Sequence, residues 1–159
     1  MSNIKIKSLN AIRAYKGADE KGKKLIKDLV GNQVDFDQKI TDVIKTFGDA
    51  CEALNINPAS LQLDILSSME DGKALVAFKK LSIIRQALNE GWTPDWANDN
   101  EWKYWPWMKY VPGSGFSFYD YVGDRTYSGV GSRLCFKTRE LAEYAGRQFQ
   151  YLYNEYFLL

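Results

Sequence analysis

The pattern of apolar and polar positions divides the chain into a helical part, which ends near Glu90, and a second part with short extended segments. In the first part apolar residues recur at spacings of three and four, which is typical of amphipathic helices. This pattern predicts helices over residues 9–16, 20–30, 37–54, 59–68 and 73–90. Gly17, Gly31 and Gly91 each follow one of these segments, where helices commonly end.

From Trp92 onward, prolines and glycines separate short segments rich in Trp, Tyr and Phe, residue types that favour strands. The pattern predicts strands over residues 103–110, 116–122 and 129–136. Thr138 is the expected N-cap of a long final helix that runs to Leu158. Gly146 costs that helix up to about 1 kcal/mol relative to alanine. We therefore expect another part of the chain to approach Gly146 closely.

Together these elements predict an α+β protein with a helical N-terminal half and a small antiparallel, aromatic-rich sheet packed by the C-terminal helix. A length of 159 residues suits one domain with a small helical appendage. We expect a basic N-terminal helical segment over residues 1–36 and a single α+β domain over residues 37–159.

All five tryptophans lie between Trp92 and Trp107. If all five were buried, they would contribute on the order of 25 kcal/mol of gross hydrophobic transfer. The cluster is therefore either the main core or the main binding surface, because a large exposed apolar patch usually marks an interaction site. Burial of all five indoles would favour an assembly role. Two or more indoles on an open groove with Lys103 or Arg133 would favour a ligand.

Composition excludes several kinds of chemistry. The chain has no histidine, which excludes Ser-His-Asp and Cys-His catalysis and histidine-ligated zinc. Cys51 and Cys135 have no neighbouring cysteine and are expected to be reduced and buried. The sequence shows neither a long apolar segment nor a signal peptide. We expect a cytoplasmic protein with no membrane partner and no cofactor.

Charge is uneven along the chain although the formal net charge is only +1. Residues 1–27 contain eight lysines and arginines but only Asp19 and Glu20 as acids. Such a segment is either an electrostatic footprint for a polyanion or a solvated helix face.

Aromatic and basic residues alternate over much of the second part of the chain. Proteins that hold single-stranded nucleic acid or nucleotides stack bases on aromatic rings and bind phosphates with Lys and Arg. The sequence therefore predicts a non-enzymatic protein that binds nucleic acid or a nucleotide. The predicted ligand-binding residues are Trp96, Trp102, Lys103, Tyr104, Trp105, Trp107, Lys109, Arg125, Tyr127 and Arg133. Because Tyr and Trp also anchor protein interfaces, a protein-interaction module or a homo-oligomer is the alternative.

One segment matches a catalytic pattern. Pro94-Asp95 followed by Glu101-Trp102-Lys103 resembles the PD-(D/E)xK signature of metal-dependent nucleases. The resemblance implies that Asp95 and Glu101 bind a divalent cation while Lys103 positions water. The short spacing between the two halves barely permits a turn and speaks against this function. In the other interpretation Asp95 caps a turn, and Glu101 and Lys103 share a solvated strand face.

Several segments resemble a family of proteins carried by bacteriophages and prophages of Bacteroidetes-type gut bacteria. They include Gly91-Trp-Thr-Pro-Asp-Trp-Ala-Asn98 and Gly131-Ser-Arg-Leu-Cys-Phe-Lys-Thr-Arg-Glu-Leu-Ala-Glu-Tyr-Ala-Gly146. At Val43 and Gly48 the chain departs from the Arg and Glu usual in that family. The resemblance implies a setting inside a bacterial host cell. There the partner would be nucleic acid, a phage protein of the virion, or a host defence protein.

Overall fold

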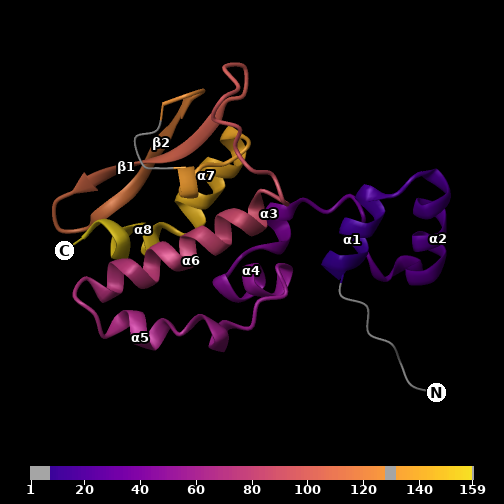
Figure 1. Ribbon diagram of the computed structural model, residues 1–159, viewed down its shortest axis with the longest axis horizontal. Helices are drawn as coiled ribbons and strands as arrows, with labels where there is room; N and C mark the ends of the chain where they lie inside the picture. Colours follow the sequence, from indigo (N-terminus) through magenta and orange to yellow (C-terminus); the bar gives the residue numbers. More distant parts are fainter. Residues whose placement is uncertain (1–7, 128–131, 159) are drawn as a thin grey trace. The chain divides into compact units, whose positions relative to one another are not determined.

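The computed structural model describes residues 8–127 and 132–158 of the chain (Figure 1). The chain divides into two compact units, Met1–Asp42 and Val43–Leu159. The division lies a few residues after the boundary expected between positions 36 and 37. The first unit contains the basic segment, and the second contains the tryptophan cluster.

The first unit is built from two helices joined by a short turn. They are α1 (Ser8–Gly17) and α2 (Glu20–Val30), followed by the 3-10 turn η1 (Gly31–Gln33). Asp19 starts α2, because its carboxylate accepts a hydrogen bond from the Gly22 N–H at 2.8 Å. Gly31, with a φ of 56°, ends α2. Both helices agree with the prediction from the sequence.

The single helix predicted over residues 37–54 is wrong. The structure has two short helices there, α3 (Ile40–Val43) and α4 (Phe47–Ala53). Between them Thr46 is extended, and its hydroxyl accepts a hydrogen bond from the Asp49 N–H at 3.1 Å. The Asp49 carboxylate accepts the Thr46 N–H in return, at 2.7 Å. This reciprocal cap starts a new helix inside a continuous apolar pattern.

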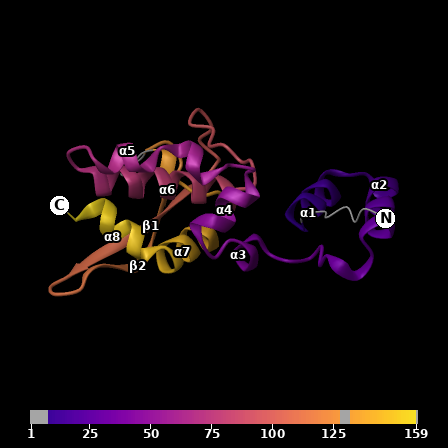
Figure 2. The same ribbon diagram turned by 90° about the horizontal axis from the view of Figure 1, so that it is seen from below.

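The centre of the second unit is the long helix α6. It follows the 3-10 turn η2 (Pro58–Leu61) and α5 (Leu63–Ser67), and it spans Gly72–Leu88. The buried residues of α6 are Gly72, Ala77, Leu81, Ile83, Ile84, Ala87 and Leu88. Because α6 contacts α4 and α5 as well as α8, it lies between two layers of helix (Figure 2). The predicted central helix is confirmed.

The sheet is an antiparallel hairpin of β1 (Lys103–Val111) and β2 (Gly115–Asp124). Gly113 and Gly115, in the tight turn and at the start of β2, have φ values of 80° and 78°. The register shifts once, so that Trp107 pairs with Asp120 while Met108 pairs with Phe118. Tyr119 is therefore the extra residue of a β-bulge.

The third predicted strand, residues 129–136, is wrong over its described residues. Positions 129–131 lie outside the described residues, and Ser132–Leu134 forms a 3-10 turn. Phe136 makes one isolated bridge to Tyr104 of β1. Leu134, Cys135 and Phe136 are buried in succession, a pattern different from the alternation of a half-buried strand.

The predicted C-terminal helix is interrupted. It consists of α7 (Arg139–Gln148) and α8 (Gln150–Phe157), separated at Phe149, whose φ of −113° and ψ of 25° are not helical. The Phe149 side chain is completely buried, so packing fixes the break. The start of α7 agrees with the prediction, because the Thr138 hydroxyl accepts the Leu141 N–H at 3.3 Å.

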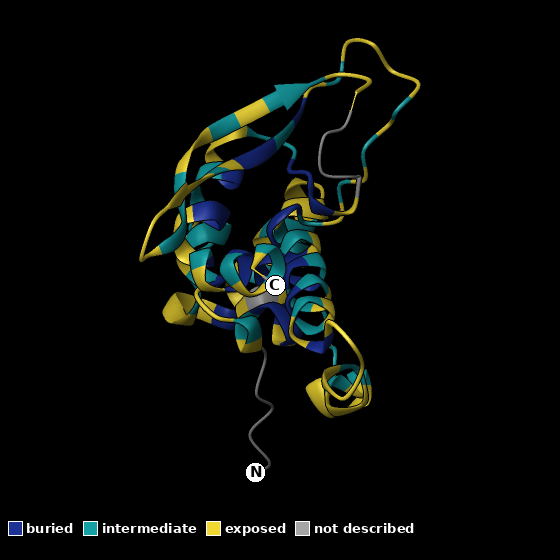
Figure 3. Ribbon diagram, turned by 90° about the vertical axis from the view of Figure 1, so that its left-hand side faces the viewer, coloured by how far each residue is buried: buried dark blue, intermediate teal, exposed yellow. Residues whose placement is uncertain are grey.

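The hairpin lies against α7 and α8, with α6 beneath them (Figure 1). The close approach expected at Gly146 is confirmed. A Cβ there would overlap the Phe118 ring and lie 2.9 Å from Cβ of Pro106. Cys51 and Cys135 are buried free thiols, as expected. The protein is an α+β protein whose hairpin is mostly exposed or half-buried, with a buried stretch near the start of β1 (Figure 3).

Candidate binding surface on the hairpin

The five indoles divide between the interior and the surface. Trp105 is buried at 2% exposure, and Trp92 and Trp96 are half-buried. Trp102 and Trp107 keep 45% and 54% of their surface exposed. The cluster is thus neither wholly core nor wholly surface, and two indoles are exposed to solvent.

Lys103, expected on the surface, lies inside the molecule with 0% exposure. Its ammonium group donates hydrogen bonds to the backbone carbonyls of Asp95, Asn98 and Glu101, and lies 3.3 Å from the Glu101 carboxylate. It also lies 5.3 Å from the centroid of the Trp96 ring. The expectation of a solvated face shared by Glu101 and Lys103 is therefore wrong. Lys103 holds the loop of residues 92–102 against the start of β1.

Glu101 completes this arrangement. Its carboxylate accepts hydrogen bonds from the Asp95 N–H at 2.8 Å and from the Trp92 indole N–H at 3.2 Å. Desolvation acts to raise the pKa of Glu101, but these hydrogen bonds and Lys103 outweigh it, so the pKa lies below its usual value. The Glu101 carboxylate is therefore held ionised as a structural acceptor.

The residues of the nuclease-like pattern have structural partners. Asp95 accepts the Ala97 N–H at 3.0 Å, so it caps a turn as expected. Glu101 and Lys103 bind the loop backbone. In the described part of the chain, no three His, Cys, Asp or Glu side chains come together in a way that could hold a metal ion. The geometry gives the nuclease hypothesis no support.

The first exposed set, which we call the Trp102 surface, lies where β1 begins and β2 ends. It consists of Trp102, Tyr104, Tyr121, Arg125 and Arg139. The Arg125 guanidinium lies 4.9 Å from the Trp102 ring centroid, and the Trp102 and Tyr104 rings stack with centroids 6.3 Å apart. A hydrogen bond with the Tyr121 hydroxyl raises the pKa of Arg139. One exposed ring, Trp102, and two half-buried tyrosine rings therefore lie in a connected set with two arginines.

The second set, which we call the outer face, lies in the middle of the hairpin. It consists of Trp107, Lys109, Tyr119, Asp120 and Val122, which alternation and the bulge place on one side of the hairpin. Tyr119 is 64% exposed, and the Lys109 ammonium lies 5.5 Å from its ring centroid. With one cation and one anion, the outer face has no net charge.

The ten predicted ligand-binding residues therefore do not form a single site. The exposed ones are Trp102, Trp107, Lys109, Arg125, Tyr127 and Arg133; the half-buried ones are Trp96 and Tyr104; the buried ones are Lys103 and Trp105. The prediction missed Arg139, the first residue of α7, because no sequence signal indicates that it meets Tyr121. Arg133 contacts a different part of the fold, where its carbonyl accepts a hydrogen bond from Arg85 at 3.1 Å.

The β2 edge of the hairpin is closed by amide side chains of α8. Asn154 accepts the Phe116 N–H and donates to the Phe116 carbonyl, both at 2.6 Å, and Gln150 accepts the Phe118 N–H at 3.0 Å. These bonds replace those of a third strand. Side chains of the hairpin are therefore better placed than this edge to bind a partner.

Charge separates the two units. The first unit has nine lysines and arginines against six acids, whereas the second has twelve against fourteen. The aromatic surfaces thus belong to a slightly acidic unit, so long-range attraction of a polyanion to them is weak.

No helix in the described residues is long and apolar enough to cross a membrane. Comparison with family models, with curated proteins and with solved structures gave no significant match.

Proposed function

We propose that this chain is a non-enzymatic binding protein that holds single-stranded nucleic acid at the Trp102 surface. The observation that carries the proposal is the stacking of Arg125 on Trp102 at 4.9 Å, while Trp102 stays 45% exposed. An exposed ring offers a stacking face to any base, and a guanidinium fixed beside it can bind the adjoining phosphate.

The neighbouring residues support a short binding site. Tyr104 and Tyr121 extend the row of rings, and Arg139 adds a second cation, although Glu140 pairs with it at 3.1 Å. Exposed Tyr127 follows shortly after Arg125 in the chain. Because the unit as a whole is slightly acidic, stacking is expected to supply most of the affinity, and the dependence on salt is expected to be weak.

The test is fluorescence anisotropy of a labelled single-stranded oligonucleotide, with mononucleotides and duplex DNA as competitors. Trp102→Leu is expected to weaken binding by about tenfold or more, because one stacked base contributes about 1 to 3 kcal/mol. Arg125→Gln is expected to weaken it to a smaller extent.

Trp107→Leu is the matched control, since it removes a similarly exposed indole from the outer face. Equal losses for both tryptophan variants, or no binding by the wild-type chain at high micromolar concentrations, would remove the proposal.

The outer face supports a second candidate, a protein-interaction module. An uncharged patch with exposed Trp107 and Tyr119 resembles the aromatic centre of protein interfaces more than a phosphate site. A partner from a bacterial extract should be lost with Trp107→Ser and Tyr119→Ser and retained with Trp102→Leu. A partner that is still bound by Trp107→Ser and by Tyr119→Ser would contradict this function. The phage family resemblance stays a prediction and suggests where such a partner would be sought.

A further inference from the structure

Arg85 is a half-buried arginine of α6 that forms no ion pair with the described residues. Its Nε–H donates a hydrogen bond to the Arg133 carbonyl at 3.1 Å, which is the only hydrogen bond of its side chain to this part of the chain. A guanidinium group has five N–H donors. The two Nη groups of Arg85 therefore remain available to a ligand.

The surroundings of Arg85 disfavour its positive charge. Burial lowers the pKa of Arg85, and the positive charge of Arg133 lowers it further. Cys135 acts in the opposite direction, but burial raises the pKa of that thiol to about 11, so it carries no charge at neutral pH. Glu90, the next acid along the chain, pairs with Lys137 at 3.2 Å. A cation that is partly removed from water beside a second cation is stabilised by an anion.

The segment that carries Arg133 is fixed on α6. The buried side-chain amide of Asn89 donates a hydrogen bond to the Cys135 carbonyl at 2.9 Å and accepts the Lys137 N–H at 3.1 Å. With the bond from Arg85, these contacts hold the backbone on both sides of Cys135. Arg133 is therefore anchored beside Arg85, while its own side chain is exposed and forms no ion pair with the described residues.

We propose that Arg85 and Arg133 form an oxyanion site that holds a phosphate group with two negative charges. The two Nη groups of Arg85 can bind two oxygens of one phosphate, the bidentate geometry that arginine favours. Arg133 supplies the second positive charge. A phosphate monoester carries a charge of about −1.5 to −2 near neutral pH, which matches two arginines better than a carboxylate does. The site shares no residue with the Trp102 surface and does not rest on the proposed binding of nucleic acid.

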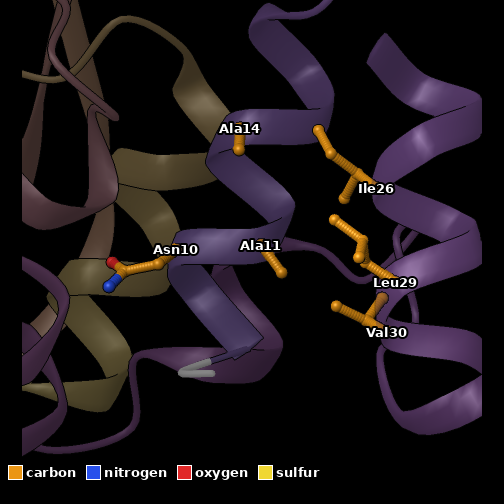
Figure 4. A pocket seen from close by; sticks show the side chains of 6 residues that line it. All are labelled: Asn10, Ala11, Ala14, Ile26, Leu29 and Val30. Carbon is orange, nitrogen blue, oxygen red and sulfur yellow. The ribbon is translucent and has the colours of Figure 1, made fainter. Parts of the chain in front are cut away.

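The groove of the lysine-rich first unit is not a site of this kind. It lies between α1 and α2, has a volume of about 190 Å³, and is lined by apolar side chains and one asparagine. Ile26, Leu29 and Val30 project into it from α2 (Figure 4). Lys23, on the same helix, already pairs with Glu20 at 2.8 Å. A phosphate would meet no charged side chain among the residues that line this groove.

The test is an NMR titration of the full chain, labelled with heavy nitrogen, with inorganic phosphate at constant ionic strength. We expect the Nε–H resonances of Arg85 and Arg133 to shift together and to saturate in the millimolar range. Acetate, with one negative charge, is expected to bind at least about tenfold more weakly. Adenosine monophosphate distinguishes the source of the phosphate. Binding as tight as that of inorganic phosphate would indicate a phosphate monoester, whereas binding of inorganic phosphate alone would indicate the free ion, and both results support the site.

Two variants assign the binding to this site. Arg133→Gln removes an exposed charge without affecting the fold, and Arg85→Lys keeps the charge but removes the bidentate geometry. Each is expected to raise the Kd for phosphate by about tenfold or more. Lys79→Gln is the matched control, because it removes an exposed cation from the same helix and should leave the Kd unchanged.

Three outcomes would overturn the proposal. The first is the absence of any saturable shift at tens of millimolar phosphate. The second is a Kd that Arg133→Gln and Arg85→Lys leave as it is in the wild type. The third is binding of acetate as tight as that of phosphate. Failure of oligonucleotides to bind the Trp102 surface would remove the proposed function and leave the result of this titration unaffected.

Discussion

Two lysines of β1 lie over aromatic rings in opposite surroundings. Lys103 lies 5.3 Å from the Trp96 ring centroid and is completely buried, whereas Lys109 lies 5.5 Å from that of Tyr119, which is 64% exposed. By alternation both lysines lie on the same face of the strand. The residues preceding β1 fold over the pair of Lys103 and Trp96, which we call the inner pair. They leave the pair of Lys109 and Tyr119, which we call the outer pair, exposed. The same pairing of residue types thus serves structure at one end of the strand and is available for binding further along it.

Lys103→Met tests the inner pair and should give the largest effect. The loop carbonyls and the Glu101 carboxylate would lose their donor inside the protein, which is expected to cost about 3 to 5 kcal/mol of the free energy of unfolding. Urea denaturation followed by tryptophan emission measures this, and it reports the second unit because all five tryptophans lie there. A loss below about 1 kcal/mol would mean that Lys103 does not hold the loop.

Gly146→Ala tests the face of the hairpin that is packed on α7. A Cβ would overlap the Phe118 ring and crowd Pro106, so a loss of about 1 to 3 kcal/mol is expected by the same measurement. Gly48→Ala in α4 is the matched control, because its Cβ would meet only Thr46 Oγ1, at 3.5 Å. This control should stabilise the protein by up to about 1 kcal/mol. Similar effects of the two substitutions would contradict the close packing.

Glu101→Gln tests whether the stability contributed by the Glu101 carboxylate, which lies beside the inner pair, depends on pH. Because the pKa of Glu101 is lowered in the folded state, its charge contributes stability above the ordinary value of 4.5, and this contribution is lost as pH falls. The difference in unfolding midpoint between wild type and Glu101→Gln should therefore be present at neutral pH and shrink in acid. A constant difference from neutral pH down to about pH 3, below the ordinary carboxyl range, would show that the charge of Glu101 contributes nothing.

The sequence predicted the elements whose signals are local. Asp19 and Thr138 cap helices where they were expected to, and the periodicity of α6 was sufficient to identify it. The break before α4 was also signalled locally, by the Thr46 and Asp49 pair, but the apolar spacing around it masked that signal.

The unpredicted features depend on contacts between distant residues. Burial of Lys103 requires the preceding loop to turn three carbonyls toward it, and the break at Phe149 follows from the packing of that ring. The sequence could predict that some rings of the tryptophan cluster are exposed, but it could not identify which ones. Which indole lies on which side depends on the register shift at Tyr119, which no residue pattern indicated.

Lys109→Met tests the outer pair and should have the smallest effect on stability. The ammonium lies over an exposed ring and is solvated on its other sides, so the free energy of unfolding should change by no more than about 0.5 kcal/mol. The measurement is the same urea denaturation used for Lys103→Met. Methionine preserves most of the apolar length at both positions, so the difference between the two variants isolates the surroundings of the charge. A loss at Lys109 as large as that at Lys103 would mean that the outer face is part of the core, and the hairpin would then have no exposed aromatic surface to offer a partner.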